Sequence, residues 1–97
     1  MERHLSQDDM ITELTQKLPL LRETYDINQT RLGVLVGKSR QQISKIERGI
    51  TPLAWDTCLA IVMVTHNRNS ILFDEVMGND YYAQLHDFIN KPDNKTA

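Results

Sequence analysis

The chain has 97 residues, of which 40% are hydrophobic and 25% charged, a composition typical of one domain with a single core. The longest apolar run, Cys58–Val64, is far too short to cross a bilayer, and the first residues do not resemble a signal peptide. We therefore expect a cytoplasmic protein without a membrane partner. The single cysteine, Cys58, excludes an internal disulfide, has no metal-ligand spacing to other residues and is expected in the core.

The distribution of charge is more informative than its total. A net charge of −2 argues against a nucleic-acid partner, because phosphate binding depends on basic surface. However, the segment from Arg31 to Arg48 holds five basic residues and one acidic residue, which gives it +4 and leaves −6 for the rest. The sequence therefore predicts one basic face on an acidic body.

The first predicted helix begins after Ser6, which is followed three residues later by Asp9 in a capping pattern. Apolar residues then recur at helical spacing, at Met10, Leu14, Leu18, Leu21 and Tyr25. Pro19 interrupts this pattern. The segment is either one helix kinked at Pro19 or two helices with Pro19 at the first position of the second.

Two short helices follow, each with clear start and stop signals. Asn28 is a suitable N-cap for a helix over Gln29–Val36, and Gly37 supplies the positive φ angle that a tight turn after it requires. Ser39 and Gln42 form the capping-box pattern S-x-x-Q, so Ser39 should start a third helix that ends at Gly49.

The pair Thr51-Pro52 predicts the start of a fourth helix through about Thr65. The run Cys58–Val64 could instead be a buried strand, although its Ala, Leu and Met content favours helix. We expect a loop over Asn67–Asn69.

Two further helices are expected towards the C-terminus. One covers Ser70–Met77 and is ended by Gly78, and the other covers Asp80–Asn90. Residues Lys91–Ala97 are polar and contain a proline, so we expect a frayed tail. Apolar residues lie on one side of the last helix: Tyr81, Leu85, Phe88 and Ile89.

The second and third helices should cross closely. Gly33 lies one turn before the break at Gly37, and since a glycine inside a helix costs about 1 kcal/mol relative to alanine, close packing is the natural reason for it. The shared core beneath the crossing is predicted to hold Leu32, Val36, Ile43 and Ile46. The neighbouring polar residues, Arg40, Gln41, Ser44 and Lys45, then point outward.

Such an outward face suits the reading of base pairs. Arginine can bond guanine bidentately and glutamine can bond adenine bidentately in the major groove. The alternative is an ordinary solvated helix surface, which the glycine and capping signals around this segment make less attractive.

Residues Lys17–Met63 resemble the phage repressor and Cro type of helix-turn-helix domain, also called the xenobiotic-response-element type. The most specific part is Gly37–Gly49, which ends in I-S-K-I-E-R-G. The resemblance implies an all-α, five-helix lambda-repressor-like domain over residues 17–78, with Ser39–Arg48 as its recognition helix. Residues 1–16 would be a partly helical extension, and residues 79–97 an additional C-terminal helix and tail.

The resemblance also implies roles for individual residues. Gln29 matches a phosphate-contacting glutamine at the start of the second helix. Arg22 matches an arginine of the first helix that pairs with the glutamate at Glu47. The residues expected to read bases are Arg40, Gln41, Gln42, Ser44 and Lys45. The residues expected to contact phosphates are Gln29, Lys38, Ser39 and Arg48.

The sequence thus favours a sequence-specific transcriptional regulator that binds double-stranded DNA as a homodimer, without metal or cofactor. Apolar surface for dimerisation is expected in Ile71, Leu72 and Phe73 and in the stripe of the last helix, although these residues could equally pack within their own chain. An alternative is an antitoxin that binds DNA and a toxin protein. An enzyme has little support, because His4, His66 and His86 are widely separated and no glycine-rich phosphate loop is present.

Overall fold

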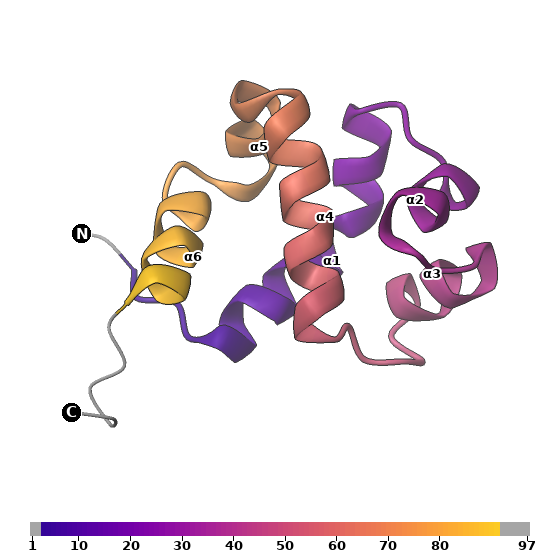
Figure 1. The fold of residues 1–97 in the computed structure, drawn as a ribbon, viewed down its shortest axis with the longest axis horizontal. Coiled ribbons are helices and arrows are strands. Elements are labelled where there is room, and N and C mark those ends of the chain that lie inside the picture. The colour runs from indigo at the N-terminus through magenta and orange to yellow at the C-terminus, as the bar shows by residue number, and fades with distance from the viewer. Residues whose placement is uncertain (1–2, 92–97) are drawn as a thin grey trace.

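The computed structural model of the protein describes residues 3–91, which form six α-helices and no strand. The helices are α1 (Gln7–Thr24), α2 (Gln29–Val36), α3 (Arg40–Glu47), α4 (Trp55–Arg68), α5 (Ser70–Met77) and α6 (Tyr81–Asn90). The molecule measures 42 × 28 × 21 Å, with α1, α4 and α5 in the middle, α2 and α3 at one end and α6 at the other (Figure 1). The predicted all-α fold with an additional C-terminal helix is confirmed.

Helix α1 is one continuous helix that contains Pro19. The capping box at Ser6 and Asp9 is present, as predicted. Leu14 and Leu18 before the proline and Leu21 after it are all fully buried. Because this apolar face packs on the core along its whole length, its burial outweighs the cost of about 3 kcal/mol of a proline inside a helix.

Helix α4 begins at Trp55, three residues after the predicted start at Pro52. The prediction was wrong because the turn after α3 extends further: the N–H groups of Ile50 and Thr51 both donate to the carbonyl of Lys45, at 2.9 and 3.3 Å. Leu53 is then drawn into the core, with 3% of its surface exposed. The N-cap is Ala54, which has no side chain able to bond the helix.

The predicted loop over Asn67–Asn69 is also wrong, since α4 runs through Arg68. Asn69 alone separates α4 from α5. Its N–H donates to the Thr65 carbonyl at 3.2 Å, and its side-chain oxygen accepts from Ile71 and Leu72 at 3.0 and 3.1 Å. One asparagine therefore ends one helix and caps the next, while the predicted bounds of the fifth helix are confirmed.

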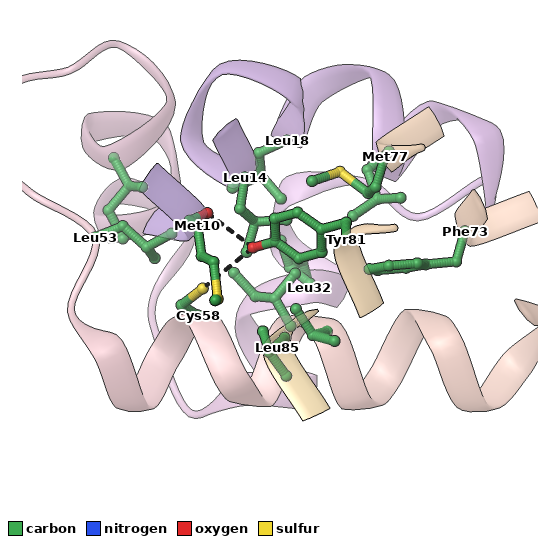
Figure 2. Close-up of a cluster of buried hydrophobic side chains, with 14 of the residues drawn as sticks. Met10, Leu14, Leu18, Leu32, Leu53, Cys58, Phe73, Met77, Tyr81 and Leu85 are labelled. Atoms are coloured by element: carbon green, nitrogen blue, oxygen red, sulfur yellow. Dashed lines mark hydrogen bonds between the residues drawn. The ribbon is translucent and has the colours of Figure 1, made fainter. Parts of the chain in front are cut away.

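The core is centred between α1, α4, α5 and α6, and Tyr81 lies inside it (Figure 2). The Tyr81 hydroxyl donates to the Met10 carbonyl at 2.7 Å and lies 3.8 Å from the sulfur of Cys58. Cys58 is buried, as predicted, and this burial raises the pKa of its thiol to about 11. The last helix is thus attached to the first by a buried tyrosine.

The start of the chain and α6 are also joined by polar contacts. The Leu5 N–H donates to Gln84 Oε1 at 2.6 Å, and Gln84 Nε2 donates back to the Arg3 carbonyl. Arg3 pairs with Asp80, at 2.8 Å, and with Glu13. Residues 3–16 and 79–91 therefore contact each other and contribute to the main core. The predicted frayed tail lies, except for Lys91, outside the described residues.

Candidate nucleic-acid interface

The α2–turn–α3 unit is shaped by the capping residues that the sequence predicts. Asn28 Oδ1 accepts from the Arg31 N–H at 2.8 Å, and Gly37 ends α2 with a φ of 77°. The Ser39 hydroxyl oxygen accepts from the Gln42 N–H at 3.1 Å, while Gln42 Oε1 accepts from the Ser39 N–H at 2.8 Å. These bonds satisfy the N–H groups of Arg31, Ser39 and Gln42, which are among the backbone donors that the starts of the two short helices leave open.

Gly33 allows the turn to fold back onto α2. A Cβ atom at this position would overlap the carbonyl oxygen of Lys38 and crowd Ser39. The Lys38 N–H also donates to the Gly33 carbonyl at 2.8 Å. The predicted close approach is present, but it is between α2 and the backbone that leads into α3 rather than between the two helices themselves.

The inner side of the unit is apolar. Leu32, Ile43 and Ile46 are buried, as predicted, and Val36 is half-buried against the same core. Burying these side chains fixes the rotation of α3 about its own axis. The residues between them are consequently directed outward.

The five residues predicted to read bases all lie on α3. Arg40, Gln41 and Lys45 are exposed, and Ser44 is half-buried. Gln42 is exposed too, but its amide oxygen is engaged in the capping box, which leaves only its N–H groups for another partner. The outward surface of α3 therefore carries two cations and a free amide within two turns.

The residues predicted to contact phosphates are spread over the same end of the molecule. Ser39 and Arg48 are exposed at the two ends of α3, and Lys38 is half-buried in the turn. Lys38 and Lys45 line an open hollow of about 370 Å³ between α3 and the start of α4, together with Gln42, Ile46, Thr51, Pro52, Ala54 and Thr57. Gln29 is the first residue of α2 and is half-buried.

The structure brings Arg22 and Glu47 together in a two-pronged ion pair between α1 and α3. Arg22 Nε lies 2.5 Å from Glu47 Oε2 and Arg22 Nη2 lies 3.0 Å from Oε1, with the side chains only 14% and 7% exposed. The hydrogen bonds to Glu47 raise the pKa of the Arg22 guanidinium. Arg22 Nη1 also donates to the Ile27 carbonyl at 3.2 Å, which holds the turn between α1 and α2.

One member of this network was not predicted from the sequence. Gln29 Nε2 donates to Glu47 Oε1 at 3.1 Å, so the predicted phosphate ligand is bonded to the predicted ion pair. The two residues are separated by 18 positions, and no local pattern indicates their contact. Only the packing of α2 against α3 could have revealed it.

Other kinds of site find no support in the described part of the chain. Within residues 3–91, no three histidine, cysteine, aspartate or glutamate side chains come together as metal ligands. None of the six helices combines the length and the apolar character that a membrane span requires.

Comparison with known proteins identifies the domain. Neither the curated proteins nor the solved structures contain a match to the chain. Residues 20–64 match the family described as Helix-turn-helix, a stretch that begins in the second half of α1 and ends within α4. This stretch, which includes α2, the turn and α3, is therefore similar to the lambda repressor and Cro type of helix-turn-helix, as the sequence predicts, and that family consists of DNA-binding regulatory domains.

Proposed function

We propose that the protein is a sequence-specific transcriptional regulator of the cytoplasm that reads the major groove of DNA with α3. The observation that carries this proposal is the two-sided character of α3. Ile43 and Ile46 are buried beneath it, while Arg40, Gln41 and Lys45 are exposed on its outer side. A helix held in this way can enter the groove without losing its own packing.

The chemistry of the exposed side chains fits base edges. Arg40 and Lys45 can donate to the acceptors of guanine, and Gln41 can both donate to and accept from adenine. The proposed phosphate contacts come from the flanking residues Gln29, Lys38, Ser39 and Arg48, which would fix the position of α3 along the duplex. The positive charge of the Arg31–Arg48 segment favours the approach of this end of the molecule to DNA.

Selection of bound sequences from a random DNA pool tests this function, and substitutions then test the reading face. Arg40→Ala and Gln41→Ala should each weaken binding to the selected site by about 1–3 kcal/mol and relax the preference at single positions. Gln29→Ala should weaken binding to all sequences alike. The matched controls are Gln16→Ala and Arg68→Ala, which remove exposed side chains of the same types from α1 and α4. Unchanged affinity and preference in Gln41→Ala would refute the proposed face.

We further propose that the protein acts as a homodimer on a two-fold symmetric site, since one short helix contacts only a few base pairs. The structure narrows the available surface. Of the apolar residues considered for an interface, Phe73, Tyr81 and Leu85 follow the alternative that the sequence left open, since they are buried in their own chain, and Leu72 is half-buried. The large apolar side chains that stay exposed around α4, α5 and α6 are Met63, Ile71, Phe88 and Ile89.

The spacing of half-sites would reveal which face pairs. If the two protomers contact each other near α3, their recognition helices would lie about 34 Å apart, which is one helical turn of DNA. Pairing through α6, at the opposite end of the 42 Å long axis, would require a spacing of more than one turn (Figure 1). Sedimentation on synthetic sites of both spacings distinguishes these arrangements. A protein that is monomeric at tens of micromolar and stays monomeric on both DNAs would refute the dimer. A copurifying second polypeptide would favour the antitoxin alternative.

A further inference from the structure

Glu47 accepts one more hydrogen bond than its ion pair with Arg22 provides. Its carboxylate accepts two hydrogen bonds from Arg22, and Oε1 also accepts from Gln29 Nε2 at 3.1 Å. The Glu47 side chain is 7% exposed. The network therefore joins the end of α1, the beginning of α2 and the end of α3 at one point.

The contact with Glu47 determines how the Gln29 amide is oriented. An ionised carboxylate can only accept hydrogen bonds, so the amide must turn its NH₂ group towards Glu47. One of the two amide N–H bonds is used in this contact, and the other is left at the first turn of α2. The backbone N–H groups of Gln29 and Thr30 at this turn have no hydrogen-bond partner within residues 3–91. Glu47 thus holds a side-chain donor beside two open backbone donors.

The charge of the pair matters as much as its geometry. A phosphate that approaches the first turn of α2 also approaches the Glu47 carboxylate, whose negative charge alone would repel it. Glu47 is moreover the last residue of α3, where the helix dipole disfavours an anion. Arg22 offsets this charge through its two hydrogen bonds, so the pair presents a neutral surface.

We propose that the Arg22–Glu47 pair does more than link α1 to α3. It also positions the Gln29 side chain for its contact with a DNA phosphate. Glu47 orients Gln29 towards the phosphate, and Arg22 keeps the carboxylate from repelling it. This inference rests on the proposed function, because it assigns a role to residues beside the proposed phosphate contact of Gln29.

Binding of the selected DNA site and of an unrelated duplex by three variants tests this role. Arg22→Gln leaves the negative charge of the Glu47 carboxylate without its positive partner, so it should weaken binding to both duplexes, on the order of tenfold. Glu47→Gln keeps an acceptor for Gln29 but removes one negative charge, so it should tighten binding to both duplexes, by about threefold. The double variant Arg22→Gln/Glu47→Gln should bind more tightly than Arg22→Gln alone.

A purely structural ion pair predicts a different pattern. Both single variants would then weaken binding in proportion to their lower melting temperatures, and that result would overturn the inference. Leu85→Ala is the stability control, because Leu85 lies in the core on α6 and its truncation should lower the melting temperature without changing the affinity of the folded protein. If Arg22→Gln does not fold, the direction in which Glu47→Gln changes the DNA affinity distinguishes the positioning role from the purely structural one. Wild-type protein that binds neither duplex would refute the proposed function itself.

Discussion

The two ends of the molecule are held together in different ways. At one end, α2 and α3 are short helices defined by contacts close in sequence, such as the capping box of Ser39 and Gln42. At the other end, α6 is attached to α1 by contacts between residues far apart, such as Tyr81 with Met10 and Leu5 with Gln84. The comparison indicates that the caps of α2 and α3 are set by local contacts, whereas the attachment of α6 depends on contacts between distant parts of the chain.

The largest effect is expected from Gly33→Ala. The added methyl group would overlap the Lys38 carbonyl, and since backbone cannot move aside easily, the turn and the start of α3 must shift. We expect a loss of about 2–3 kcal/mol in unfolding free energy, measured by urea denaturation, together with weaker DNA binding. The control is Val34→Ala on the same helix, since Val34 is 67% exposed. Equal stability of the two variants would contradict the close approach.

Tyr81→Phe tests the attachment of α6. Loss of the buried hydrogen bond to the Met10 carbonyl should reduce the unfolding free energy by about 1–1.5 kcal/mol. The matched control is Tyr82→Phe, because the Tyr82 hydroxyl has no hydrogen bond within residues 3–91. The Tyr82 ring stacks on the His66 ring, with 3.5 Å between the ring centroids. Thermal melts of both variants provide the comparison. An equal loss of stability in Tyr82→Phe, which removes a hydroxyl without a hydrogen bond and keeps the ring stack, would contradict a specific role of the Tyr81 hydroxyl.

Ser39→Ala tests whether the start of α3 is set by local contacts. Removal of an N-cap side chain costs about 1 kcal/mol, and here it also frees the Gln42 side chain. Ser70→Ala is the control, since Ser70 is exposed at the start of α5, where Asn69 provides the cap. Hydrogen exchange should show faster opening of α3 in Ser39→Ala while α6 is unaffected. An equal acceleration of hydrogen exchange in α3 and in α6 would refute the expectation that α3 opens independently of α6.

The smallest effect is expected from Asp80→Asn. The hydrogen bond from Arg3 holds the pKa of Asp80 below its ordinary value of 3.8. The contact therefore stabilises the fold above this value, and its contribution is lost as the pH falls through the lower pKa of the folded state. Urea denaturation between pH ~5 and ~2 should show a shallower pH dependence in Asp80→Asn than in wild type. Arg3→Gln, which also removes the contact with Glu13, should reduce the pH dependence at least as much as Asp80→Asn. Additive effects of the two substitutions would argue against the Arg3–Asp80 pair.

Local signals predicted much of this fold. Asn28, Gly37 and the Ser39 capping box gave correct bounds for α2 and the correct start of α3, because caps act on backbone groups within three residues. The same reasoning failed at Pro52, where a proline that is suited to a helix start lies in an extended turn instead. The conformation around Pro52 depends on tertiary packing, because Leu53 is buried in the core and no local sequence pattern predicts that burial.

The candidate site shows the same division. The outward direction of Arg40, Gln41 and Lys45 follows from the periodicity of one helix. The hydrogen bond between Gln29 and Glu47 joins two helices and depends on their packing, so no sequence pattern indicates it.

The contact between Leu5 and Gln84 brings the beginning of the described chain next to its last helix, at the end of the molecule remote from α2 and α3 (Figure 1). A fluorophore attached close to either of these positions would stand clear of a duplex held by α3. A short peptide could also join the two regions, so that new chain ends can be opened elsewhere. Permuted chains of this kind would then separate the order of the helices along the chain from their ability to bind DNA.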